Sequence, residues 1–114
     1  MEYTDEFEGW WITLTIAEQA AIDDAVAALQ QLGPSLGRPW VDTIKTSHHS
    51  NMKELRPRGG NIRVLFAFDA RRTAILLVGG DKTGQWQDWY DETVPEADRL
   101  YEEHLNDIVD EGTP

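Results

Sequence analysis

The chain has 114 residues, a formal net charge of −11 at pH 7 and no cysteine. This length allows one domain with one modest core, and the missing thiols exclude disulfides and thiolate-bound metal clusters. The first residues are acidic and the apolar runs are short, so we expect neither a signal peptide nor a membrane helix. These features predict a single cytoplasmic domain over residues 1–114, with a frayed acidic tail at residues 110–114.

Charge is distributed unevenly along the chain. Residues 1–37 contain seven acids and no Lys or Arg, residues 38–82 contain nine bases and four acids, and residues 83–114 contain ten acids and one base. The net charge argues against a nucleic-acid partner, but screening acts over about 8 Å at physiological salt. A basic patch from the middle of the chain can therefore still attract phosphate. The alternative is that these charges only keep the protein soluble.

The first half of the chain predicts a strand and two helices. Aromatic and β-branched residues over 7–14 favour a first strand. Thr15 and Glu18 match a capping box, so a helix begins there and ends at Gly33 and Pro34. A short second helix is expected around residues 40–44, and residues 47–50 are typical of a loop.

The second half predicts a three-stranded antiparallel meander followed by a helix. Strands are expected at residues 52–56, 62–68 and 73–78, separated by turns at 57–61 and 69–72. A flexible loop over residues 79–84 and an aromatic segment over 86–90 follow. Thr93 and Glu96 match a second capping box, which predicts the start of the C-terminal helix. The predicted fold class is α+β, with a sheet made of an N-terminal strand and the meander.

Strand register brings basic residues together at one end of this meander. If the first hairpin turns at residues 58–61, paired residue numbers sum to 119 and Arg56 lies opposite Arg63. A sum of about 141 in the second hairpin places Arg63 beside Val78, close to Lys82. Like charges directly opposed destabilise a sheet, so this arrangement suits a bound anion, unless a bulge splays the arginines into water. By contrast, the turn at residues 69–72, which holds two further arginines, lies about 20 Å away.

Such a cluster suits cleavage of RNA at phosphate. Guanidinium groups bind phosphate oxygens and offset the charge of the transition state. Lys82 or Lys53 could act as the general base on a ribose 2′-hydroxyl, because neighbouring arginines disfavour the charged form of a lysine. Tyr90 could donate a proton or stack, and Trp86 could stack on a base, although both rings could instead be buried against the helices.

Other candidate groups are weaker. His48 and His49 lie in a polar loop without a third metal ligand at a suitable spacing, and His104 falls on the last helix. The glycine-rich residues 79–84 lack the spacing of a nucleotide-binding P-loop. We therefore expect no metal and no cofactor.

Four segments together resemble a known family. They are Lys-Glu-Leu-Arg at residues 53–56, the strand at 62–68, residues 73–82 ending in Gly-Gly-Asp-Lys, and Ala-Asp-Arg-Leu-Tyr at 97–101. They resemble the RelE/HigB toxin superfamily, in particular its phage-derived Gp49-like branch. The resemblance implies a RelE-like fold and a type II toxin that cleaves mRNA, usually on the ribosome, by metal-independent 2′-hydroxyl attack. It also implies a helix-turn-helix antitoxin partner, through which alone the toxin would reach operator DNA.

The resemblance assigns roles to particular residues. Arg63 matches the arginine of the middle strand, Lys82 the basic residue after the glycine-rich strand end, and Tyr90 the C-terminal aromatic residue. Lys53 and Arg56 bracket the position of the first-strand lysine, where this chain has Glu54. Apart from the resemblance, the basic and aromatic residues expected to contact RNA are Arg58, Arg71, Arg72 and Trp86.

Two other functions remain compatible with the sequence. The first is a gyrase-poisoning, ParE-like toxin on the same scaffold, which blocks DNA replication without cutting transcripts. The second is a non-enzymatic, degenerate toxin that only binds its antitoxin, which the marked acidity of the chain favours.

Overall fold

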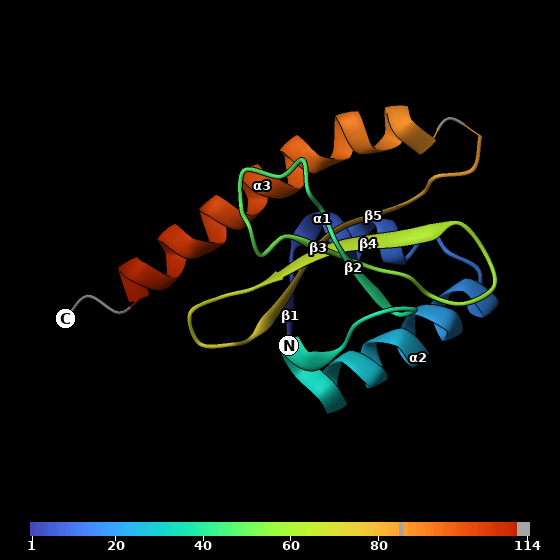
Figure 1. Cartoon of the computed structure of the whole chain (residues 1–114), viewed down its shortest axis with the longest axis horizontal. Coiled ribbons are helices and arrows are strands. Elements are labelled where there is room, and N and C mark those ends of the chain that lie inside the picture. Colours follow the sequence, from blue (N-terminus) through green and yellow to red (C-terminus); the bar gives the residue numbers. More distant parts are fainter. Residues whose placement is uncertain (85, 112–114) are drawn as a thin grey trace.

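A computed structural model describes residues 1–84 and 86–111 (Figure 1). Its elements in chain order are β1 (Glu2–Tyr3), α1 (Asp5–Trp11), α2 (Ile16–Leu32), a 3-10 turn (Gly33–Ser35), β2 (Val41–Thr43), β3 (Lys53–Leu55), β4 (Ile62–Phe68), β5 (Ala74–Asp81) and α3 (Trp86–Glu111). The strands form one sheet in the order β1-β5-β4-β3-β2. Only β1 runs parallel to its neighbour, so the predicted α+β class is confirmed, with a mixed sheet.

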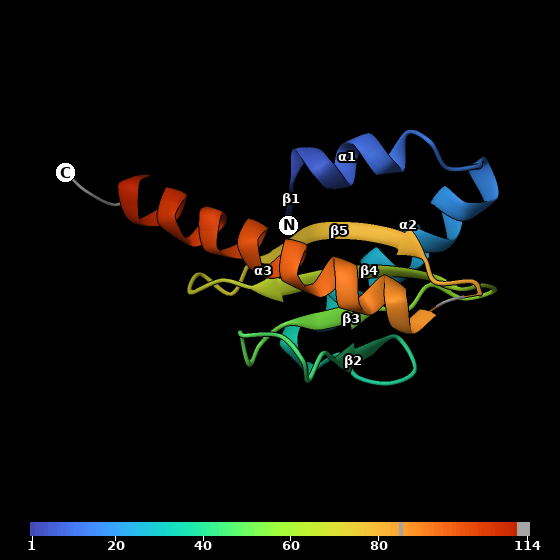
Figure 2. The same ribbon diagram turned by 90° about the horizontal axis from the view of Figure 1, so that it is seen from above.

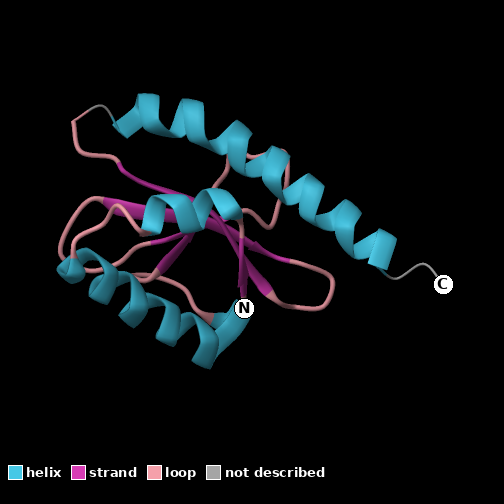
Figure 3. Cartoon of the chain, turned by 180° about the vertical axis from the view of Figure 1, so that it is seen from behind, coloured by secondary structure: helices cyan, strands magenta, loops and turns pink. Residues whose placement is uncertain are grey.

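Helices cover both faces of the sheet, and the sheet separates the hydrophobic core into two clusters. Figure 2 shows α3 in front of the strands, and Figure 3 shows α1 and α2 from the other side. One cluster packs α1 and α2 against residues such as Phe66 and Leu76, and the other packs α3 against residues such as Leu65 and Ile75. Within the described residues, no helix is long and apolar enough to cross a membrane.

The strand predicted at residues 7–14 is wrong, because most of this segment is helix α1. The Thr4 hydroxyl accepts a hydrogen bond from the Phe7 backbone N–H at 3.0 Å and caps the helix. Acidic residues in the first turn complement the helix dipole. Phe7, Trp10 and Trp11 then share one face at spacings of three and four, which is the helical period. The N-terminal strand of the fold is instead the short β1.

Helix α2 begins and ends as predicted, but the segment after it does not form a second helix. Thr15 and Glu18 make both hydrogen bonds of the capping box, and the chain reverses at Gly33 with φ of +57°. Residues 41–43 form the edge strand β2, whose Val41 lies opposite Leu55. Tertiary pairing with β3 has overridden the weak local helical pattern here.

The register of the first hairpin is confirmed, whereas that of the second is wrong. Lys53 pairs with Phe66 and Leu55 with Val64, so paired numbers sum to 119. In the second hairpin, β5 continues through the predicted loop to Asp81, and Arg63 pairs with Gly80 instead of Val78. A bulge beside Leu65 and Phe66 shifts the register within this pair of strands.

The bulge decides which face of the sheet receives the end of β5. Leu76 packs on the α1 and α2 side, while Leu77 and Val78 both pack on the α3 side. Because side chains alternate along a strand, one extra residue moves Gly80 and the following Lys82 to the α3 side. Without the bulge, strict alternation would have placed Lys82 on the face opposite Arg63.

Two glycines in β5 allow both helices to approach the sheet closely. A Cβ atom on Gly79 would lie 2.2 Å from the Trp10 ring of α1. One on Gly80 would lie 2.3 Å from Nε1 of Trp89, in α3. The two indoles therefore pack against opposite faces of the same strand segment, where only a hydrogen side chain fits.

The start predicted for the C-terminal helix at Thr93 is wrong, because α3 already begins at Trp86 and passes through Pro95. Pro95 is exposed, and the helix continues across it. Tyr90, Val94, Ala97 and Tyr101 recur at helical spacing and pack on the sheet. This long apolar stripe outweighs the single backbone hydrogen bond that proline removes.

Candidate active site

An open pocket of about 420 Å³ lies between the β2–β3 end of the sheet and the first turns of α3. Its lining comes from four parts of the chain, and all but one of its side chains are charged or polar. The lining residues are Thr43, Ile44, Lys45, Thr46, Glu54, Arg56, Lys82, Gln87 and Tyr90. Two of the basic residues predicted from strand register, Arg56 and Lys82, therefore open onto a common concavity together with an acid and a phenol. Arg63 does not line this concavity, although it lies beside Glu54.

Glu54 lies at the centre of this pocket and is only 4% exposed. Its Oε1 accepts a hydrogen bond from the Tyr90 hydroxyl at 2.7 Å and lies 3.4 Å from Nε of Arg56. Nε of Arg63 is 3.0 Å from the same oxygen, although its N–H is not aligned with it for a hydrogen bond. A buried carboxylate is tolerated here because two guanidinium groups and a phenol surround it.

Arg63 is held from two sides. Its guanidinium Nη1 donates to the backbone carbonyl of Ile62 at 2.8 Å, and its side chain is 12% exposed. Nε is buried and has no hydrogen-bond acceptor among the described residues. Arg63 therefore acts on the pocket through its positive charge beside Glu54 and not as part of the pocket lining.

Lys82 joins this group because of the bulge in β5. Its backbone N–H donates to the Asn61 carbonyl at 3.0 Å, which fixes the chain as it leaves the sheet. Its ammonium lies 5.9 Å from the centre of the Tyr90 ring. Burial lowers the pKa of Lys82, and the charges of Arg63 and Arg56 lower it further, whereas Glu54 acts in the opposite direction. The amine is thus more readily deprotonated than a surface lysine.

Tyr90 fixes the position of Glu54 and of the pocket wall. Burial raises the pKa of Tyr90 well above its usual value, and the hydrogen bond to Glu54 raises it further. The phenol therefore keeps its proton at neutral pH. Trp89 packs against the Tyr90 ring edge-on at 5.0 Å, so the close approach of Trp89 to Gly80 also positions Tyr90.

A second carboxylate continues the charge pattern toward the edge of the sheet. Asp42 in β2 lies 3.5 Å from Nη2 of Arg56 and 2.8 Å from Nη2 of Arg38. The cations that line the pocket, Lys45, Arg56 and Lys82, and the adjacent Arg63 are thus opposed by Glu54 and Asp42. The site keeps a small positive excess rather than a strongly basic surface.

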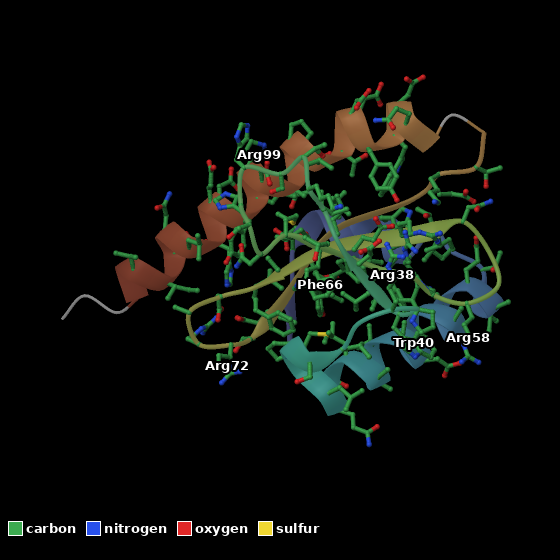
Figure 4. The ribbon with its side chains drawn as sticks, viewed as in Figure 1. Arg38, Trp40, Arg58, Phe66, Arg72 and Arg99 are labelled. Atoms are coloured by element: carbon green, nitrogen blue, oxygen red, sulfur yellow. The ribbon has the colours of Figure 1, made fainter. Side chains whose placement is uncertain are left out.

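Not every residue predicted for the site lies there. Lys53 pairs with Phe66 and faces the α1 and α2 side, because neighbouring residues of a strand point to opposite faces. Arg58 is exposed and its guanidinium lies 4.8 Å above the Trp40 ring, near one end of the sheet (Figure 4). Although the helix includes Trp86, its side chain lies outside the described part of the chain.

Arg71 and Arg72 lie in the turn between β4 and β5 and, as predicted, neither lines the pocket. Figure 4 shows Arg72 at the opposite end of the sheet from Arg58. Arg72 is exposed, with φ of +63°. Arg71 instead forms ion pairs with Glu2 at 2.5 Å and with the buried Asp69 at 2.8 Å. We therefore place Arg71 in a structural network rather than in an RNA site.

The histidines do not enter the pocket. His104 approaches Asp69 at 3.2 Å, and Glu2, Asp69 and His104 place one ligand atom each within 4.8 Å of one another. Arg71 already binds both carboxylates of this group, so a cation of the protein occupies the position that a metal would need. His49 lies 3.2 Å from Glu102, and His48 is exposed in the loop.

Glu54 and Asp42 are the functional candidates that sequence reasoning missed. Glu54 was visible as an acid between Lys53 and Arg56, in a strand whose alternation places it on the same face as Arg56. Its contact with Tyr90 joins residues 36 positions apart. No short-range pattern could have indicated this contact.

Comparison with known proteins yields one family and two similar sequences. Residues 9–102 match the family described as phage-derived protein Gp49-like (DUF891). The chain is 49% identical over 100 residues to HigB3 of Mycobacterium tuberculosis, a provisionally named toxin, and the match covers 88% of either chain. It is 48% identical over 89 residues to HigB2 of the same organism, also a provisionally named toxin, over 75% of this chain and 44% of HigB2.

The fold has a counterpart among solved structures. A chain in the crystal structure of the RelB–RelE antitoxin–toxin complex from Methanococcus jannaschii superposes with a TM-score of 0.60, at 15% identity. The match covers 80% of this chain and 96% of the other, so the predicted RelE-like fold is confirmed. The sequence matches identify the branch: the chain belongs to the phage-derived Gp49-like family, among the HigB-like members of the RelE/HigB toxin superfamily.

Proposed function

We propose that this protein is the toxin of a type II toxin–antitoxin system and that it cleaves mRNA within the Glu54 pocket. One observation carries the proposal, namely that Arg56 and Lys82 line an open concavity with the buried Glu54, which Arg63 contacts from beside the pocket. The toxin names of the two mycobacterial relatives support the same class of function. The complex of the RelE neighbour with RelB supports a protein antitoxin as partner.

The geometry suggests roles for the side chains in a 2′-hydroxyl attack. Glu54 accepts the proton of the ribose 2′-hydroxyl while the 2′-oxygen forms its bond to phosphorus. Arg56 binds the non-bridging phosphate oxygens, and its charge together with that of the nearby Arg63 offsets the added negative charge. Lys82 gives a proton to the departing 5′-oxygen as the phosphorus–oxygen bond breaks. The products are a 2′,3′-cyclic phosphate and a 5′-hydroxyl.

This assignment changes the general base that the sequence suggested. Lys53 faces the other side of the sheet, and Lys82 lies among cations that stabilise an anion. Glu54 is the carboxylate that lines the pocket beside both arginines. Tyr90 holds it in place through the 2.7 Å hydrogen bond.

The test is to induce the protein briefly in cells and map the 5′ ends of transcripts. The wild-type chain should generate new ends within coding sequences, and Glu54→Gln should reduce them by about 10²–10⁴-fold. Glu96→Gln is the matched control, because it makes the same change at an exposed acid of α3 that does not line the pocket. Growth arrest with blocked replication and intact transcripts would contradict cleavage and indicate a gyrase-poisoning toxin. No arrest at all would indicate a chain that only binds an antitoxin.

A further inference from the structure

A second concavity lies on the side of the sheet away from the Glu54 pocket. It measures about 430 Å³ and is formed by α1, α2 and the β1–β5 edge. Large apolar side chains make up most of its lining, in particular Tyr3, Phe7, Trp11, Ile12, Val26 and Leu76. We call it the apolar groove. None of its lining residues also lines the Glu54 pocket.

The apolar groove is open along the surface rather than closed over. Ile12 is 73% exposed and Tyr3 is 58% exposed, so its walls are themselves in contact with water. Large apolar side chains gathered at an exposed concavity are typical of a surface that binds another protein. Few polar groups are available to orient a small ligand, since the polar side chains that line it are Glu8, Asp23 and Gln30.

The charges around the apolar groove are negative. Glu8 and Asp23 lie on its lining, and both are exposed. All Lys and Arg residues of the chain come after residue 37, and no basic side chain lines this groove. A partner that covers the apolar floor therefore binds most favourably if the residues at the edge of its own contact surface are positively charged.

We propose that the apolar groove binds an amphipathic α-helix of a partner protein, with apolar residues on one face and Lys or Arg on the flanks. The groove lies between two helices, and a third helix can place residues i, i+3, i+4 and i+7 against such a floor. Addition of a strand is disfavoured, because the edge strand β1 has only two residues. This proposal stands apart from RNA cleavage, since it uses other residues on another face.

The test uses a synthetic 18-residue helix of leucine and lysine, and the same peptide with glutamate in place of lysine. Binding to the full chain is measured by tryptophan fluorescence and calorimetry. We expect one molecule of the lysine peptide per chain and at least 10-fold weaker binding of the glutamate peptide. Reversing the charge at the rim of the groove with Glu8→Lys and Asp23→Lys should weaken binding of the lysine peptide at least 10-fold. Ile12→Asp, at an exposed wall position, should do the same without unfolding the chain.

The matched control reverses two exposed acids of α3, Glu92→Lys and Glu96→Lys, with the same change in net charge. It should leave peptide binding within about 2-fold. Equal losses in both charge variants would show attraction to net charge alone and overturn the proposal. Equal binding of the two peptides, or none, would also overturn it. A dimer of the free chain that Ile12→Asp dissociates would assign the groove to a second copy instead.

Discussion

Replacing Gly80 with alanine tests how the glycines of β5 position the candidate active site. The new methyl group would meet Nε1 of Trp89 at 2.3 Å, so the indole and the first turns of α3 have to move. Overpacking of this kind lowers the free energy of unfolding by about 1–3 kcal/mol. The lower conformational entropy of the unfolded alanine chain raises it by about 0.4–1 kcal/mol. We expect a net loss of about 1–2 kcal/mol in the free energy of unfolding.

Urea denaturation followed by tryptophan fluorescence measures this loss, and an RNA cleavage assay measures its consequence. Displacement of Trp89 moves Tyr90 and its hydrogen bond to Glu54, so activity should fall even where the chain is folded. Gly60→Ala is the control, because nothing lies within 4 Å of its added Cβ. If Gly80→Ala matched the wild type in stability and activity, the packing argument would be refuted.

Three further predictions concern stability and the pocket. Burial opposes ionisation of Asp69, but hydrogen bonds from Arg71, His104 and the backbone outweigh it and lower its pKa to about 2. The corresponding stability, about 2 kcal/mol, is present at neutral pH and is lost as the pH falls from about 4 to 2, so acid unfolding curves of Asp69→Asn should lack this step. Gly9→Ala, in helix α1 with open space around it, should raise the free energy of unfolding by about 0.5–1 kcal/mol in urea titrations. Tyr90→Phe removes the hydrogen bond to Glu54 and should lower the cleavage rate without a large change in melting temperature; an unchanged rate would exclude a positioning role.

The parts of the fold that the sequence predicted correctly are those with strong local signals. The capping box at Thr15 and the turn at residues 57–61 fixed the start of α2 and the register of β3 against β4. The segment now known as α1 was misread because its aromatic residues favour strands, although their spacing of three and four is helical. Helix α3 begins before the predicted start at Thr93, because Trp89 and Tyr90 pack against the core on that side of the sheet.

The geometry of the candidate site depends on features that no local sequence pattern reveals. Residues 74–78 are uniformly apolar, so their alternation could not show that a bulge shifts the phase of β5. That shift places Lys82 on the face of Arg56 and Arg63 even though the predicted register was wrong. Likewise, Glu54 is buried beside Tyr90 of helix α3, and the two residues lie 36 positions apart in the sequence. The contact therefore forms only when the chain is folded.

The presence of a carboxylate among the arginines also bears on the acidity of the chain. Glu54 and Asp42 offset much of the positive charge in and beside the pocket. If the site cleaves RNA as proposed, it does not rely on a strong general attraction for the nucleic acid. We expect its specificity to come from positioning of one phosphate rather than from long-range charge.

The central claim is tested most directly by cleavage of a defined mRNA, free and on translating ribosomes, by the purified chain. The account predicts a 2′,3′-cyclic phosphate and a 5′-hydroxyl at the cut, no cut when the attacking 2′-hydroxyl is replaced by hydrogen, and a loss of about 10²-fold or more in Glu54→Gln. Cleavage of the 2′-deoxy substrate at the normal rate, or full activity of a folded Glu54→Gln chain, would contradict it.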